Sequence, residues 1–297
     1  DVSFLATGFR SATYVERQAE LCTIAAHNFP ALDLNHISVR NDDGVAYLEA
    51  MSPVDCIFLD PARRNEHGGK TVAISDCEPN VAELEGLLLS KANRIMIKLS
   101  PMLDLSQALK ELPHTQEVHI ISVNNECKEL LLLLGQTAPE EIPVHCVNLS
   151  TKGEQEKQLF VFTREQEQHS ECSYTDTLGN YLYEPNASLL KAGAFRSIAA
   201  AYSVKKLHPN SHLYTSDTQI EGFPGRTFRI INRCSLNKKE IKENLSDLKK
   251  ANITVRNFPA TVAELRKRIK LAEGGDTYLF ASTLNDGQKI LIRCGKV

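Results

Sequence analysis

The stretch that decides the fold is residues 55–70, DCIFLDPARRNEHGGK. Its apolar run ends at Asp60 and Pro61, and two arginines follow. A short apolar run without polar alternation is typical of a strand that is buried on both faces of a parallel sheet. Proline cannot continue the hydrogen bonding of such a strand. The stretch therefore predicts an α/β protein in which a buried strand ends on a carboxylate, a proline and two guanidinium groups.

Strand-like and helix-like segments alternate from residue 1 to about residue 165. Helical patterns, among them 81–91 and 126–134, separate strand-like segments at 12–16, 36–40, 55–60, 94–99, 117–123 and 144–149. This alternation indicates a parallel sheet covered by helices on both faces. Residues 144–165 instead contain two strands around a polar turn at 151–157, which adds one antiparallel strand. We therefore expect a Rossmann-like sheet that ends in a hairpin.

The C-terminal part of the chain predicts a compact, ferredoxin-like βαβαββ module. Strands at 226–233 and 252–258 alternate with two helices. Asn237 and Thr261 precede these helices, each with a glutamate three residues later, as in a capping box. The segment LNDGQ at 284–288 is a strong hairpin turn between the last two strands.

Residues 169–225 separate these two regions. They contain one helical pattern, which Pro185 and Asn186 are expected to begin, and then a turn-rich stretch that ends in GFPG. We therefore predict three domains: a catalytic domain at 1–168, a connecting α+β segment at 169–225 and a basic domain at 226–297.

The composition limits the classes of protein that the chain can belong to. With 297 residues, 42% of them hydrophobic, the chain can bury a large core, and no stretch approaches a membrane span in length. The eight cysteines are scattered, and none forms a C-x-x-C pair. This predicts reduced thiols in a cytoplasmic protein without disulfides or a metal site. The sequence gives no sign of the oligomeric state.

The net charge of −3 conceals an asymmetry between the two ends of the chain. Residues 226–297 hold 16 Lys and Arg against 7 Asp and Glu, whereas the first 225 residues hold 18 against 30. A basic module joined to an acidic one favours a polyanionic partner. The alternative is a solvated, lysine-rich surface without a partner.

Four charged residues follow successive predicted strands. They are Glu16, Asp43 in NDDG, Asp60 in DPARR and Lys98 in KLSP. In a doubly wound sheet, ligands bind beyond the carboxyl ends of the strands, and the two oxygens of a carboxylate match the hydroxyls of a ribose. Each residue alone could be a helix cap or a turn residue. Together they indicate a binding site on one edge of the sheet.

With Glu16 and Asp43 at those positions, followed by FLDPARR, IKLSP and a terminal hairpin, the chain resembles the class I S-adenosylmethionine-dependent methyltransferases. With YLYEPNASLLKAGAF at 181–195 and the basic C-terminal module, it resembles more narrowly the bacterial methyltransferase-like proteins with a THUMP-like domain, over essentially its whole length. The resemblance implies that Glu16 binds the cofactor's ribose and Asp43 its adenine amine, with Asp42 as the second choice. It also implies a catalytic loop with Asp60, Pro61 and Arg63, and Lys98 nearby.

Two features depart from the family pattern. The glycine-rich loop that would hold the methionine part of the cofactor is absent, and we expect that sequence upstream of Asp1 has been lost. Ala62 and Arg63 replace the second proline and the aromatic residue of the usual D-P-P-(Y/F) loop. Arginine can stack on a base or grip a phosphate. We therefore expect Asp60 to accept a hydrogen bond from the substrate nucleophile, while the stacking role of Arg63 stays open.

The sequence leaves three roles undecided. DPAR also resembles the D-P-P-R loop of the tRNA uracil-5 methyltransferases, which need a cysteine nucleophile; the nearest is Cys127, which reads better as an inert thiol. The loop at 63–79 carries His67 and Lys70, which could contact a phosphate or act as a base, or have no role. Lys98 could form a structural ion pair with Asp60 or contact the substrate.

The segment ELRKRIK places four cations on and around one helix face: Arg266, Lys267, Arg268 and Lys270. Such cations bind phosphates without sequence specificity, and the THUMP-like resemblance implies RNA as the partner. We therefore predict an S-adenosylmethionine-dependent methyltransferase that modifies a tRNA or rRNA base. The alternatives are a methyltransferase of a protein or small molecule, and a non-catalytic RNA-binding protein on a methyltransferase scaffold.

Overall fold

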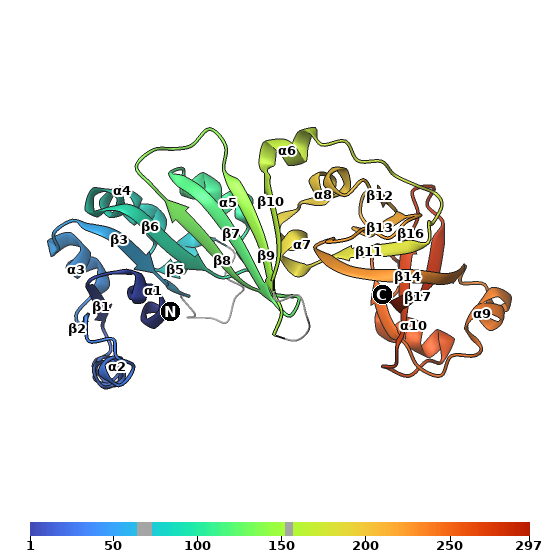
Figure 1. Cartoon of the computed structure of the whole chain (residues 1–297), viewed down its shortest axis with the longest axis horizontal. Helices are drawn as coiled ribbons and strands as arrows, with labels where there is room; N and C mark the ends of the chain where they lie inside the picture. The colour runs from blue at the N-terminus through green and yellow to red at the C-terminus, as the bar shows by residue number, and fades with distance from the viewer. Residues whose placement is uncertain (64–72, 152–156) are drawn as a thin grey trace. The chain divides into compact units, whose positions relative to one another are not determined.

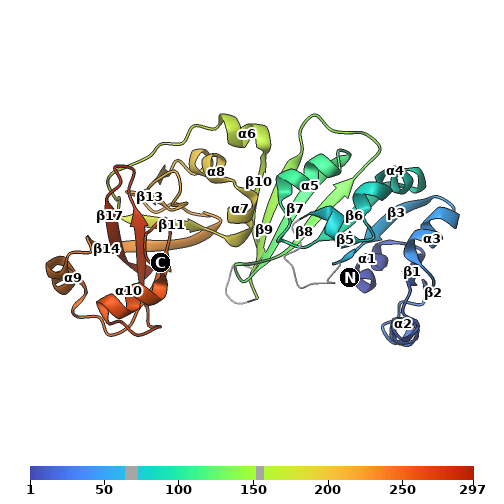
Figure 2. The same cartoon turned by 180° about the vertical axis from the view of Figure 1, so that it is seen from behind.

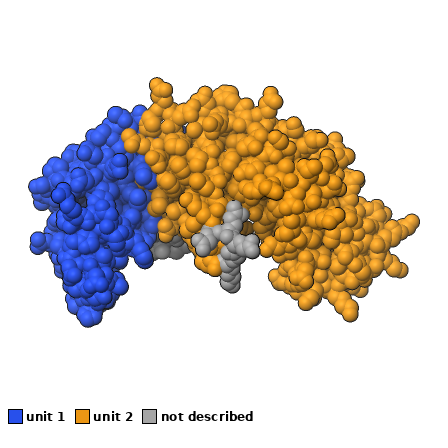
Figure 3. All heavy atoms as spheres, viewed as in Figure 1, with its two compact units in different colours: residues 1–98, 102–115, 133–138 blue, residues 99–101, 116–132, 139–297 orange. Residues whose placement is uncertain are grey.

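The computed structural model describes residues 1–63, 73–151 and 157–297, and of Arg63 it describes the backbone alone. The chain divides into two compact units (Figure 3). Unit 1 comprises residues 1–98, 102–115 and 133–138, and unit 2 comprises residues 99–101, 116–132 and 139–297. The predicted cofactor and catalytic residues therefore belong to unit 1, and the predicted basic surface belongs to unit 2.

Unit 1 begins with a sheet of two parallel strands. β1 (Ala12–Glu16) pairs with β2 (Ile37–Asn41), and α2 (Ala19–Ala31) connects them. The ring of Phe29 from α2 packs against Tyr14 of β1, edge to face, with their centroids 5.7 Å apart. This contact holds the helix on the strand pair, as expected for a strand–helix–strand unit. The strands predicted at 12–16 and 36–40 are confirmed.

A second parallel pair in unit 1 contains the apolar run that precedes Asp60. The prediction that this run is a buried strand is wrong, because it lies at the edge of its sheet and none of its residues is buried. β3 (Val54–Leu59) pairs with β6 (Ala92–Leu99), and α4 (Val81–Lys91) crosses between them. Val81 and Leu88 of α4 are fully buried. Because the two strands are parallel, their carboxyl ends lie at the same edge. The remaining elements up to residue 111 are α1 (Val2–Leu5), η1 (Ala6–Gly8), α3 (Gly44–Ala50), β4 (Ala62–Arg63), η2 (Ile74–Asp76), β5 (Cys77–Glu78) and α5 (Leu105–Glu111).

The segment Glu126–Leu134 forms strand β8, so the helix predicted there is wrong. It follows β7 (Thr115–Val123) after two residues, Asn124 and Asn125, whose φ angles of 51° and 64° lie in the left-handed region. Asparagine tolerates this conformation, and a two-residue turn joins antiparallel strands. The leucines of ECKELLLLL favour a helix by intrinsic propensity. In the strand, alternate leucines are buried: Leu130, Leu132 and Leu134.

These strands form a six-stranded sheet of order β10-β9-β7-β8-β6-β3. β9 (Pro143–Leu149) is parallel to β7, and β10 (Lys157–Thr163) is antiparallel to β9. The hairpin predicted for residues 144–165 is therefore confirmed. With β8, however, the sheet contains two antiparallel strands, one more than predicted.

The C-terminal part of unit 2 forms a seven-stranded sheet of order β12-β13-β11-β14-β17-β16-β15. Its strands are β11 (Tyr181–Pro185), β12 (Lys205–Lys206), β13 (Tyr214–Ser216), β14 (Gly225–Cys234), β15 (Asn252–Val255), β16 (Thr277–Thr283) and β17 (Lys289–Lys296). α9 (Lys238–Leu245) and α10 (Val262–Ile269) cover one face, over a core that includes Leu279 and Leu291 (Figures 1 and 2). The order β14-α9-β15-α10-β16-β17 confirms the predicted βαβαββ module.

The three predicted capping residues each begin a helix, but the capping box expected at Asn237 is not formed, because the Glu240 carboxylate accepts a hydrogen bond from the Ser235 amide at 2.7 Å. Thr261 and Glu264 form the expected capping box at α10. Asn186 caps α7 (Ala187–Ala192), but Gly193, with φ of 77°, ends that helix after six residues, and α8 (Phe195–Ala201) follows. The single helix predicted here is therefore wrong. α6 (Arg164–His169) completes the set, and none of the helices in the described residues is long and apolar enough to cross a membrane.

Candidate active site

The first pair of strand ends places Glu16 beside the segment that follows β2. Glu16 lies opposite Asn41, and its carbonyl accepts a hydrogen bond from the Asp42 amide at 3.2 Å. Asn41 Nδ2 donates to the carbonyls of Glu16 and Arg17 at 2.9 and 3.0 Å. Glu16 Oε1 accepts from the Gln18 amide at 2.8 Å, and the side chain is half-buried. The carboxylate is therefore oriented at the strand end and still reaches solvent.

Asp43 caps a helix, which is a structural role separate from the predicted contact with adenine. It is the N-cap of α3, and its Oδ1 accepts hydrogen bonds from the amides of Val45 and Ala46 at 2.9 and 3.0 Å. Asp42, the second choice for the adenine contact, accepts a hydrogen bond from the Asp43 amide at 2.8 Å. Both residues are exposed and follow directly on the strand opposite Glu16. The contact of Asp43 with adenine stays a prediction.

The second pair of strand ends brings Asp60 and Lys98 together. Leu59 lies opposite Ile97 in the parallel pair, so the next residue of each strand reaches the same edge. Lys98 Nζ lies 2.7 Å from Asp60 Oδ2 and 2.5 Å from Asp1 Oδ2. The Lys98 side chain is 19% exposed, whereas the two carboxylates are about half exposed. An enclosed cation thus holds an accessible carboxylate in position, and the ion pair that the sequence left open is present.

The catalytic-loop prediction is only partly covered by the described residues. Pro61 is half-buried and lies two residues after Leu59, the last residue of β3. Ala62 and Arg63 form β4, which pairs in antiparallel fashion with β5. The Arg63 side chain and the residues His67 and Lys70 lie outside the described residues. The stacking role of Arg63 therefore remains a prediction.

Tyr14 is a residue of this site that the sequence reasoning missed. It precedes Glu16 by two positions on β1, so the two side chains share a face of the sheet. Burial, and then the negative charge of Glu16, raise the pKa of the Tyr14 hydroxyl. The phenol therefore stays protonated and can donate a hydrogen bond beside Glu16. The period-two spacing of the strand was the signal that could have found it.

Cys127 does not have the surroundings of a nucleophile. It lies within β8 and not at the start of a helix. Burial raises the pKa of its thiol, and the opposing effect of Lys191 is smaller. A cysteine that attacks a pyrimidine must be a thiolate. The inert reading of Cys127 agrees with this environment.

The four cations predicted to bind RNA divide into two kinds. Arg266 is half-buried: it donates to the Ala251 carbonyl at 3.2 Å and lies 3.9 Å from a Glu273 oxygen. Arg268 is exposed and donates to the Leu236 carbonyl at 2.8 Å. The remaining two are exposed: Lys267 and Lys270. Three side chains of the segment can therefore contact a polyanion, whereas Arg266 is bound to groups of its own domain.

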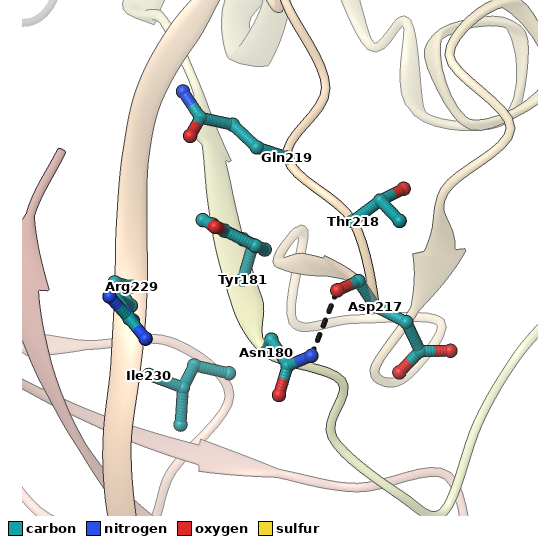
Figure 4. A pocket seen from close by; sticks show the side chains of 7 residues that line it. All are labelled: Asn180, Tyr181, Asp217, Thr218, Gln219, Arg229 and Ile230. Atoms are coloured by element: carbon teal, nitrogen blue, oxygen red, sulfur yellow. Dashed lines mark hydrogen bonds between the residues drawn. The ribbon is translucent and has the colours of Figure 1, made fainter.

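A polar hollow of about 450 Å³ lies in the C-terminal part of unit 2 (Figure 4). Tyr181, Arg229, Asp217 and Gln219 are among the residues that line it. The Asn180 amide group donates to the Asp217 carbonyl at 2.9 Å and closes one side. None of the predicted site residues lines this hollow.

Comparison with known proteins identifies the family. A family model of a ferredoxin-like domain matches residues 181–224, and one described as THUMP domain-like matches residues 225–296. The crystal structure of a "putative methyltransferase" from Porphyromonas gingivalis W83 is 38% identical, with a TM-score of 0.86. The match covers 97% of this chain and 72% of that protein. The chain belongs to the THUMP-like methyltransferase family. Among curated proteins, no sequence matches it.

In this THUMP-like methyltransferase, the sequence Glu184-Pro185-Asn186 connects several parts of unit 2. Glu184 is buried, and its carboxylate accepts hydrogen bonds from both Arg226 and Arg256. Asn186 Nδ2 donates to Gln158 Oε1 of β10 at 3.1 Å, and Gln158 Nε2 donates to the Gly225 carbonyl at 3.1 Å. The Glu-Pro-Asn sequence therefore connects β10 of the six-stranded sheet to the THUMP-like domain.

Proposed function

We propose that this THUMP-like methyltransferase transfers a methyl group from S-adenosylmethionine to a base of tRNA or rRNA. The observation that carries the proposal is the presence of acidic residues at the carboxyl ends of two parallel strand pairs of unit 1. Glu16 and Asp43 follow the separate pair β1 and β2, and Asp60, with Lys98 beside it, follows β3 in the six-stranded sheet. Open α/β sheets bind ligands beyond these ends. Two of the carboxylates suit a nucleoside, and the third is paired with a cation.

Glu16 and Asp43 fit the nucleoside part of the cofactor. The Glu16 carboxylate is accessible at the end of β1 and can accept both hydroxyl hydrogen bonds of a ribose. Asp43 keeps a second carboxylate oxygen beyond the one that caps α3, and that oxygen can accept from the adenine amine. S-adenosylmethionine, when bound, supplies an electrophilic methyl group on a sulfonium. The residues of unit 1 bind and orient it.

Asp60 would act on the substrate. Its exposed carboxylate can accept a hydrogen bond from an exocyclic amine and then its proton, which passes on to solvent. Lys98 holds the carboxylate in one orientation, because its ammonium group lies 2.7 Å from Asp60 Oδ2. Tyr14, which stays protonated, can donate a hydrogen bond beside Glu16.

The match to a THUMP-like module and the basic composition of residues 226–297 support RNA as the substrate. Lys267, Arg268 and Lys270 are exposed and can each contact a phosphate. Each such contact to a single strand lowers the slope of log K against log salt by about 0.7. RNA binding through this surface should therefore weaken steeply with ionic strength.

All eight cysteines are free thiols, three of them half-buried and five buried. Free thiols suit a compartment in which glutathione and thioredoxin keep cysteines reduced. On this basis we propose that the enzyme is cytoplasmic. Cell fractionation, with free thiols alkylated at lysis, tests this location.

Calorimetric titration with S-adenosylhomocysteine tests the cofactor site. The protein should bind one equivalent, and Glu16→Ala should weaken binding by about 10- to 150-fold, since a hydrogen bond to a charged group contributes about 1.5–3 kcal/mol. Glu20→Ala is the matched control, because Glu20 is an exposed glutamate in the first turn of α2. Absence of binding by the folded protein would refute the cofactor assignment. Equal weakening in both variants would refute the role of Glu16.

Transfer of a tritiated methyl group to total tRNA and rRNA tests the substrate. Label in RNA supports the proposal, and the modified nucleoside then names the base. Label in protein in place of RNA would support the protein-substrate alternative. Salt-sensitive RNA binding without any cofactor binding would indicate a non-catalytic RNA-binding protein.

A further inference from the structure

We propose that Glu117, His119 and His145 form a binding site for one divalent ion of the zinc class. The site lies in unit 2 and uses none of the residues assigned to methyl transfer. One ligand atom from each of the three side chains lies within 4.8 Å of the other two. The inference is independent of the proposed function.

The sheet register creates this cluster. β7 and β9 are parallel neighbours, and His119 of β7 lies directly opposite His145 of β9. Glu117 precedes His119 by two residues, so its side chain lies on the same face of the sheet. No metal motif is visible in the sequence, because the two histidines lie on different strands and meet only through the pairing of β7 with β9.

The distances are close to those that a tetrahedral ion requires. Bonds of about 2.0–2.1 Å to zinc place neighbouring ligand atoms about 3.3–3.4 Å apart. Glu117 Oε2 lies 3.2 Å from His119 Nε2 and 3.8 Å from His145 Nε2. The two imidazole rings are stacked, with centroids 4.4 Å apart and an interplanar angle of 8°. Because an imidazole lone pair lies in the plane of its ring, the two stacked rings have to rotate until both Nε2 atoms face the same ion.

The ligand types select the metal. Two imidazoles and one carboxylate suit zinc, copper or nickel, whereas magnesium and calcium prefer a shell of oxygens alone. The exposed fractions of the three side chains are 45%, 27% and 25% for Glu117, His119 and His145, so an ion can enter from solvent and keep a water as its fourth ligand.

Binding of the ion moves a proton but needs no other reactant. Each neutral imidazole presents the Nε2 lone pair to the ion and carries its single proton on Nδ1. Where His119 Nε2 donates its proton to Glu117 Oε2 before binding, that proton moves to Nδ1 by exchange with solvent and frees the Nε2 lone pair for the ion. The Glu117 carboxylate then bonds to the ion through an oxygen lone pair.

The test is titration of the EDTA-treated full chain with Zn²⁺ alone, followed by the visible absorption spectrum of the Co²⁺ form. We expect one equivalent of Zn²⁺ and a Co²⁺ spectrum of four-coordinate type with nitrogen and oxygen ligands. Loss of even an outer partner of a metal ligand weakens binding 10- to 100-fold, so His145→Asn should weaken it by about 100-fold or more. Glu117→Gln keeps the size of the side chain and should weaken binding by at least about tenfold.

The matched control is His114→Asn. His114 also lies beside a glutamate, with Nδ1 3.4 Å from Glu85 Oε2, but it is not part of the cluster. Its replacement should leave Zn²⁺ binding unchanged. Circular dichroism in EDTA shows that each variant is folded before titration. Failure of the wild-type chain to bind Zn²⁺, or unchanged binding in both cluster variants, would overturn the proposal.

Discussion

Removal of both arginines that contact Glu184 should destabilise unit 2 more than removal of Glu184 itself. The Glu184 side chain is 2% exposed, whereas those of Arg226 and Arg256 are 36% and 37% exposed. Arg256 Nη2 donates to Oε1 at 2.9 Å, and Arg226 donates to Oε2 through Nε at 2.9 Å and through Nη2. The carboxylate is therefore the buried member, and each guanidinium can regain water when its partner is lost.

This difference in burial determines how much stability each variant is expected to lose. Arg226→Met with Arg256→Met leaves a buried carboxylate without a cation, which costs about 3–5 kcal/mol. Glu184→Gln removes charge-assisted hydrogen bonds but leaves two half-exposed arginines, at a cost of about 1.5–3 kcal/mol. Combining Glu184→Leu with both arginine changes removes the unpaired charge as well. The triple variant should therefore be more stable than the double arginine variant by at least about 1 kcal/mol.

The assay combines urea unfolding, followed by circular dichroism, with hydrogen exchange of peptides from β11 and β14. Hydrogen exchange is needed because a chain of several domains does not unfold in one two-state step. Amides in these two strands report directly on the sheet that holds Glu184. A triple variant less stable than the double variant would refute the argument that burial of the carboxylate dominates. So would a larger loss in Glu184→Gln than in the double variant.

Three other changes test separate parts of the structure. A Cβ on Gly225 would lie 2.2 Å from the Glu184 carbonyl oxygen, so Gly225→Ala should lower the free energy of unfolding in urea by about 3 kcal/mol. Gly86 in α4 has open space around it, so Gly86→Ala should raise that free energy by up to about 1 kcal/mol. Burial, followed by two nearby cations, lowers the pKa of His212 to about 4. The unfolded chain thus binds more protons below about pH 6.5, so stability should fall as the pH drops from 6.5 towards 4, and His212→Gln should flatten that part of a plot of urea midpoint against pH. Asp60→Asn should lower kcat for methyl transfer by about 10²- to 10⁴-fold with cofactor binding unchanged, and an unchanged kcat would remove Asp60 from the mechanism.

Much of the fold and part of the candidate site could be predicted from local sequence. The strands at 12–16, 94–99 and 144–149 and the capping box at Thr261 depend on patterns that span a few residues. So does the position of Asp60 directly after strand β3, whereas the partial exposure of β3 follows from its place at the edge of the sheet. The pairing of Asp60 with Lys98 was within reach, because both follow strands that the α/β alternation places in parallel.

Other features depend on contacts between distant residues. A leucine run such as that of Glu126–Leu134 satisfies both a helix and a strand, and the neighbouring β6 and β7 decide the outcome. Tertiary packing likewise buries Glu184 against two arginines of the THUMP-like domain.

By itself, the sequence determined most of the strands, where most helices begin and which carboxylates stand at strand ends, because periodicity, capping and turn chemistry act over a few neighbouring residues. Only the tertiary structure decided that β8 is a strand, that Glu184 meets two arginines, and that His119 faces His145. Each of these depends on the order and register of strands that are far apart in the chain. Packing of the whole core selects that register, and no short stretch of sequence encodes it.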